Sequence, residues 1–195
     1  MRLASMLVLC MLPGCSQDTA ISAPKDNACT VAVRLAETWV RERGRQPIVF
    51  SDRVEGGVPL LIPEGWQAPS GGPGEVPPPS VLAMATRLST DSAVVRCPTL
   101  RAYLDRVRIP YGAAAEKAAT EGKRKDVTGK HVPVGLFSAE IFSLSVPGVS
   151  ADGTMALIVT GSLSAPELGG GSLLFLRRQP DGSWRQISNY STWVT

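Results

Sequence analysis

The side chains that could do chemistry are few and lie far apart in the chain. His131 is the only histidine, and it belongs to a basic stretch with Lys123, Arg124, Lys125 and Lys130. Acyl transfer needs a nucleophile, a general base and an acid that orients the base, and no serine here has the G-x-S-x-G surroundings of a nucleophile elbow. Nothing in the sequence pairs two carboxylates for glycoside hydrolysis. The sequence therefore predicts no catalytic residue. It leaves His131 as a candidate contact for a ligand or partner, in a stretch that is either simply solvated or in contact with anionic lipid headgroups.

Neither the glycines nor the cysteines form a recognisable cofactor site. The glycine run at 169–171 precedes a strand pattern rather than a helix, and no Lys-Ser or Lys-Thr pair follows it, so it does not match a phosphate-binding loop. We expect a flexible connection there. A zinc site needs four ligands, whereas Cys29 and Cys97 lie 68 residues apart without a C-x-x-C spacing. We expect no cofactor and no metal.

Trp66 is the aromatic residue of a long segment rich in proline and glycine. Thirteen of the 28 residues at 53–80 are Pro or Gly, a density that denies regular dihedral angles and backbone donors to most of the segment. We expect a surface loop at 53–80. Two roles fit Trp66: it folds back as a lid on the core, or it stacks on a ligand or partner.

The composition bounds the size and the partners of the protein. Of 195 residues, 44% are hydrophobic, which is enough for one ordinary core. Twenty basic and 17 acidic residues give a net charge of +3, far from the concentrated positive field of a nucleic-acid-binding domain. We expect a single domain and no nucleic-acid partner.

The N-terminus has the pattern of an export signal. Arg2 precedes a short apolar run that ends at Pro13 and Gly14. A run of about ten residues is too short to cross a membrane as a helix, for which ~20 are needed. The tetrad Leu12-Pro13-Gly14-Cys15 resembles the lipobox of bacterial lipoproteins.

This resemblance implies an anchor and an address. Residues 1–14 would be a signal peptide, residues 15–26 a lipidated Cys15 with a flexible tether, and residues 27–195 one folded domain. The partners would be a membrane, through the lipid on Cys15, and a further envelope protein. The expected location is the bacterial cell envelope, facing the periplasm. Ordinary signal cleavage and a buried N-terminal helix are the alternatives.

The four cysteines fit this interpretation. The leader would remove Cys10 and the lipid would occupy Cys15, which leaves Cys29 and Cys97 as an even pair in an oxidising compartment. We expect one disulfide between them. Two free buried cysteines are the alternative.

The first part of the domain is expected to be mainly helical. Apolar residues recur at spacings of three and four over residues 28–43, and Asn27 and Gly44 are placed to begin and end a helix. The other elements expected here are strands at 47–51 and 58–62, a helix or strand at 81–88, a strand at 92–96, and helices at 100–107 and 113–120. Thr99 is the expected cap of the helix at 100–107.

The last third is expected to form an antiparallel meander. Its four strands are predicted at 140–146, 154–163, 172–178 and 184–194. The first two alternate apolar and polar residues, as half-buried strands do. Asp181 and Gly182 follow a proline in a strong hairpin turn between the last two.

Residues 138–195 also carry a resemblance. The turn at 152–153, the glycines at 169–171, the D-G-S-W sequence at 181–184 and the final W-V-T look like the end of uncharacterised exported bacterial proteins with a D-G-x-W hairpin and a closing W-[VI]-[ST]. The resemblance implies an α+β fold in which N-terminal helices pack on a curved, C-terminal, four-stranded antiparallel meander, NTF2-like in outline. It implies no activity.

Two functions remain open. The first is a non-catalytic binding or accessory module on a lipid tether. The second is an NTF2-like domain with a pocket on the concave sheet face, which binds a small molecule or is weakly catalytic. Polar residues facing that concavity favour the second. A face filled by apolar side chains favours the first, and the side chains in question are Phe142, Leu144, Leu157, Val159 and Phe175.

Overall fold

The fold is α+β, as the sequence predicts. The computed structural model describes residues 28–54, 65–85, 91–122 and 136–194. Its helices are α1 (Ala28–Arg43), α2 (Pro79–Ala85), α3 (Ala93–Arg96), α4 (Pro98–Val107) and α5 (Ala113–Glu121). Its strands are β1 (Ile48–Phe50), β2 (Glu140–Leu144), β3 (Gly148–Val149), β4 (Met155–Ala165), β5 (Leu168–Arg178) and β6 (Trp184–Val194). No helix within these ranges has the length and apolar character to cross a membrane. The strand expected at 58–62 lies outside the described residues.

α1 forms where the apolar spacing predicts it. Its buried residues Val31, Ala32 and Ala36 lie on one face, which packs in the core. The helix ends at Arg43, and Gly44 follows with a φ of 57°, a left-handed conformation that glycine adopts without strain. α1 is therefore a locally encoded element, and its second face is left for other contacts.

Residues 92–96 form a cap and a short helix instead of the expected strand. The Ser92 hydroxyl accepts a hydrogen bond from the Val94 backbone nitrogen at 3.1 Å, which caps α3. The expected Thr99 cap is also wrong, because α4 begins at Pro98 directly after Cys97. Proline suits the first turn of a helix, where no backbone donor is needed. The valines here favour a strand by propensity alone, and the cap and the proline override that preference.

The sheet is mixed and has more strands than the expected four-stranded meander. Its order is β1-β2-β4-β5-β6, and β3 pairs with β4. β2, β4, β5 and β6 are antiparallel neighbours, whereas β1 adds parallel to β2, with Phe50 opposite Phe142. Parallel pairing needs a long crossover, which here contains α2 to α5. A three-residue strand has too little alternation to reveal such a pairing.

Both faces of the sheet are covered, so the expected half-buried strands are wrong. Phe142 belongs to the cluster on the face of α1, α3 and α4, whereas Leu157 and Val159 belong to a cluster on the opposite face. Every residue of β2 is buried, Ser143 included. A small polar residue buried between two layers looks in sequence like an exposed position, which is why the alternation misleads.

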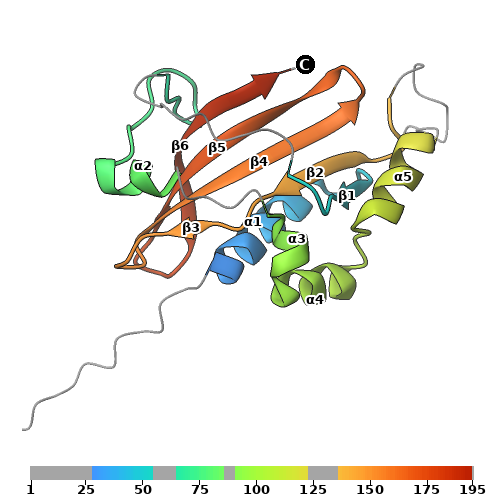
Figure 1. Ribbon diagram of the computed structural model, residues 1–195, viewed down its shortest axis with the longest axis horizontal. Coiled ribbons are helices and arrows are strands. Elements are labelled where there is room, and N and C mark those ends of the chain that lie inside the picture. Colours follow the sequence, from blue (N-terminus) through green and yellow to red (C-terminus); the bar gives the residue numbers. More distant parts are fainter. Residues whose placement is uncertain (1–27, 55–64, 86–90, 123–135, 195) are drawn as a thin grey trace, which may run out of the picture.

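Three apolar clusters make up the core. The largest lies between the sheet and α1, α3 and α4. On the opposite face, one cluster lies under α2 and Trp66, and another lies under α5 around Ala119 and Phe137. Figure 1 shows α3 and α4 together below the sheet, with α2 and α5 well apart from each other.

The glycines at 169–171 lie inside β5, not in a connection that precedes it. The turn between β4 and β5 is only two residues long, because Ala165 pairs with Leu168. Gly171 pairs with Gly161 on one side and with Trp193 on the other. A Cβ at Gly171 would overlap the indole nitrogen of Trp193. The glycine is therefore required by the position of this ring.

Candidate functional site

The residues singled out by the sequence do not gather at one place. Cys15 and His131 lie outside the described residues. Cys29 and Cys97 lie on the side of α1 and α4, whereas Trp66 packs on the opposite face of the sheet. Any functional site within the described part of the chain must therefore consist of residues that the sequence analysis did not single out.

The expected disulfide between Cys29 and Cys97 is present. Their Cα atoms are 5.3 Å apart, within the range that a disulfide spans. Cys29 lies in the first turn of α1, and Cys97 is the N-cap residue of α4. Cys97 is fully buried. The bond thus holds the start of α1 against the start of α4.

Trp66 forms a lid over the second cluster. The residue is 4% exposed, and its ring centroid lies 6.0 Å from that of Tyr190. Its neighbour Gln67 exchanges two backbone hydrogen bonds with Asn189 of β6, at 2.8 and 2.9 Å. The described part of the Pro/Gly-rich segment is therefore fastened to the edge of the sheet. Trp66 has little surface left for a ligand.

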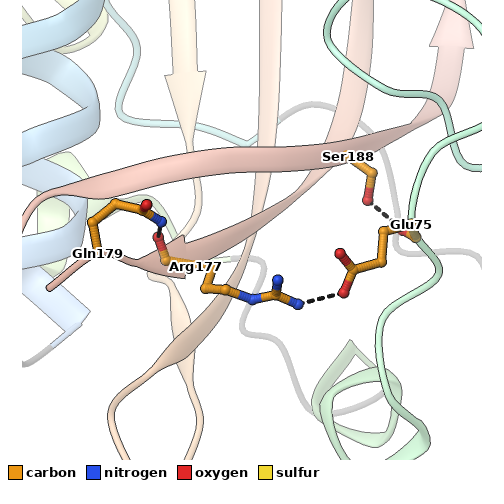
Figure 2. A network of polar contacts seen from close by, with 4 residues as sticks. All are labelled: Glu75, Arg177, Gln179 and Ser188. Atoms are coloured by element: carbon orange, nitrogen blue, oxygen red, sulfur yellow. Dashed lines mark hydrogen bonds and ion pairs between the residues drawn. The ribbon is translucent and has the colours of Figure 1, made fainter.

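Glu75 fastens the same segment a second time (Figure 2). Its carboxylate pairs with Arg177 of β5, and its carbonyl oxygen accepts a hydrogen bond of 2.6 Å from the Ser188 hydroxyl. The Arg177 guanidinium also lies 5.8 Å from the centroid of the Phe175 ring. Gln179 Nε2 donates to the Arg177 carbonyl at 3.3 Å. Gln179 also lines a groove that begins at this end of the sheet.

This groove has a volume of about 690 Å³ and lies between α1 and the turn that joins β5 to β6. One wall is a face of α1 that carries Arg34, Thr38 and Arg41. These residues are spaced by four and three along the helix, so their side chains project from the same side. The other wall comprises the end of β5, the turn at Asp181 and the start of β6.

The groove adjoins a second hollow of about 380 Å³. Both are lined by Arg34, Thr38, Arg41, Trp184 and Arg185. The second hollow is also lined by Val31, Leu35, Trp39, Pro69 and Leu176, of which Leu35 and Trp39 are partly exposed. A charged groove therefore adjoins a hollow whose lining is partly apolar.

Four arginines face two carboxylates in the groove. The arginines are Arg34, Arg41, Arg178 and Arg185. Both carboxylates already have partners: Glu37 accepts a hydrogen bond of 2.9 Å from Arg34, and Asp181 accepts from the hydroxyl and the backbone nitrogen of Ser183, at 2.6 and 2.9 Å. These hydrogen bonds from Ser183 lower the pKa of Asp181 below its ordinary value.

Arg41 and Arg185 keep their charge available. Among the described residues, no carboxylate lies within ion-pair distance of either guanidinium. Both side chains are exposed, one on each wall of the groove. A guanidinium group presents planar, bidentate donors that match carboxylate and phosphate oxygens. The groove is therefore suited to hold an anion.

The sequence gives only a faint sign of this groove. Its α1 residues follow the polar face of an amphipathic helix, which usually means a solvated surface. The second wall follows more than a hundred positions later in the chain, so no local pattern joins the two. The sequence feature that could have indicated the groove is the grouping of Arg177, Arg178 and Arg185 on the two sides of the turn at Asp181.

No three His, Cys, Asp or Glu side chains in the described ranges lie close enough together to hold a metal ion. Comparisons of the chain with models of protein families, with curated proteins and with solved structures found no match. What the groove does must therefore follow from its own chemistry.

Proposed function

We propose that this protein is a lipid-anchored module of the bacterial cell envelope, which faces the periplasm and binds a partner or ligand without catalysing a reaction. Two observations support export. The N-terminal pattern ends at Cys15 in a lipobox-like tetrad, and Cys29 is joined to Cys97. Disulfides persist mainly in oxidising compartments.

The apolar packing on both faces of the sheet is the observation that favours a binding module over an enzyme. The five apolar side chains named above, on β2, β4 and β5, are at most 4% exposed. They divide between the two faces, and each face is covered. The alternative, an NTF2-like pocket on a concave sheet face, needs polar side chains around a hollow there. In the described part of the chain, apolar side chains cover both faces of the sheet instead.

The groove between α1 and the β5–β6 turn is the binding surface in this proposal. It is open at the surface and lies outside the packed layers. Its arginines provide charge, and the adjoining hollow provides apolar contact. A module of this kind would act by holding a ligand near the membrane to which Cys15 anchors it.

Mass spectrometry of the mature N-terminus tests the anchor. The full chain, expressed in a bacterium with its own leader, should begin at an acylated Cys15. The Cys15→Ser variant should carry no acyl group, whereas the matched Cys10→Ser variant should be acylated like the wild type. A mature protein that begins at an unmodified Met1, or a Cys15 without lipid, would remove the anchor from the proposal.

A further inference from the structure

We infer that the groove between α1 and the β5–β6 turn binds the phosphate group of an anionic lipid headgroup, with Arg41 and Arg185 as its contacts. The choice of a lipid as the source of the phosphate rests on the proposed lipid anchor. The chemistry of the site is argued from the groove itself.

The two arginines flank the part of the groove that is common to both hollows. Arg41 comes from the last turn of α1, and Arg185 from the start of β6. An anion between them meets one guanidinium from each wall, and each guanidinium offers paired donors to phosphate oxygens. Glu42, at the second hollow, adds a negative charge. Arg34 and Arg178 provide the remaining positive charge of the groove.

The partly apolar lining of the second hollow favours a lipid over a free phosphate ion. Trp184 lines both hollows, and Leu35 and Trp39 line the second; all three side chains are partly exposed. A small ion would leave these side chains uncovered, whereas the glycerol and the first methylene groups of a lipid would cover them. Tryptophan side chains with one apolar and one polar contact are typical of the membrane interface.

The position of the groove on α1 is compatible with contact to headgroups. Twelve residues separate Cys15 from Ala28, and this length of chain spans at most about 45 Å when fully extended. Along α1, Arg34 and Arg41 lie about 9 and 20 Å from Ala28. An anchor at Cys15 therefore permits the groove to reach the membrane surface.

Titration with short-chain lipids tests the site. The full chain in non-ionic detergent is titrated with dioctanoyl phosphatidylglycerol, dioctanoyl phosphatidylcholine and glycerol 3-phosphate, and binding is followed by calorimetry and tryptophan emission. We expect saturable binding of phosphatidylglycerol, at least about tenfold weaker binding of the zwitterionic lipid because its choline is repelled by the arginines, and weaker binding of glycerol 3-phosphate, which lacks the acyl chains.

Two charge-reversed variants locate the binding. Arg41→Glu with Arg185→Glu should weaken phosphatidylglycerol binding at least about twentyfold, because each basic side chain near an anionic headgroup contributes about fivefold. The matched control is Arg45→Glu with Arg53→Glu, which changes the net charge equally at two exposed residues outside the groove. It should change the affinity less than about twofold. All four positions are exposed, so both variants should keep the wild-type melting temperature.

Three results would overturn the inference. If both double variants lost the same affinity for phosphatidylglycerol, the binding would depend on net charge alone. Binding of glycerol 3-phosphate as tightly as phosphatidylglycerol would mean a soluble phosphate ligand. Absence of saturable binding would mean that the groove is not a site. The mass of the N-terminus reports separately on the anchor, so an unacylated chain that still prefers phosphatidylglycerol would refute the anchor and keep the groove.

Discussion

At Gly171, the absence of a side chain decides where an indole ring can lie. Trp193 sits across the glycines of β5, and its ring also approaches Gly161 of β4 and Gly169, at 3.4 and 3.2 Å from the Cβ that each would carry. A ring over strand glycines supplies the packing that those residues lack. Trp193 is thus a structural residue, and Gly171 is the position that it constrains most.

Replacing Gly171 by alanine should destabilise the protein by about 1–3 kcal/mol, because the new Cβ forces the indole out of place. Gly170→Ala is the matched control. Its Cβ would meet only the Trp193 carbonyl oxygen, at 3.5 Å, so the free energy of unfolding should change by no more than about 0.5 kcal/mol. Urea unfolding followed by circular dichroism measures both.

A double-mutant cycle isolates the ring as the cause. In a Trp193→Ala background, Gly171→Ala should cost less than it does in the wild type, since the indole atoms are gone and only the Thr192 hydroxyl, 2.7 Å from the new Cβ, still has to shift. An equal cost in the two backgrounds would show that the glycine is needed for another reason, such as its pairing with Gly161.

At the scale of elements, α1 serves both the core and the groove. Its buried face packs in the largest cluster, and its polar face forms one wall of the groove. Its C-terminal end is fixed by Arg43, which donates to Glu140 of β2 at 3.1 Å and lies 5.3 Å from the centroid of the Phe142 ring. Its N-terminal end is fixed by Cys29. A helix held at both ends keeps its wall of the groove in place.

Elements with a local signal could be predicted from the sequence. α1 follows its apolar spacing, and the turn at Asp181 and Gly182 follows its residue types. Two features could not be predicted. The sequence predicts a strand at 47–51, where β1 lies, but not its parallel pairing with β2 across four helices. It also predicts a strand at 92–96, where Ser92 caps α3 against strand propensity. The groove could not be predicted either, because its two walls meet only in the folded chain.

The disulfide should contribute more to stability than any surface contact. It closes a loop with a sequence separation of 68 residues, for which the chain-entropy estimate is about 4 kcal/mol. Reduction should therefore lower the urea midpoint strongly. Cys29→Ala with Cys97→Ala should unfold at a similarly low midpoint, and a reductant should have no further effect on it. Peptide mapping that recovers Cys29 and Cys97 as free thiols from the native exported protein would refute the bond.

At the scale of the whole molecule, one sheet holds the layers together. Alternate residues of β4 belong to different clusters: Ala156 and Ile158 to the cluster under α1, Leu157 and Val159 to the cluster under Trp66. All four are at most 2% exposed. Because β4 carries both layers, any opening that disorders β4 exposes both layers at once. The described parts of the domain should therefore unfold as one unit.

Two neighbouring substitutions in β4 test this coupling. Leu157→Ala and Ile158→Ala each remove a fully buried side chain from a different layer, and each should cost about 2–5 kcal/mol. If the layers are coupled, each variant should show one urea transition, with tryptophan fluorescence and far-ultraviolet circular dichroism at the same midpoint. Trp66 reports on the one layer and Trp39 on the other. Two separate transitions, or a Leu157→Ala midpoint that falls by fluorescence and not by circular dichroism, would show that the face under Trp66 opens by itself.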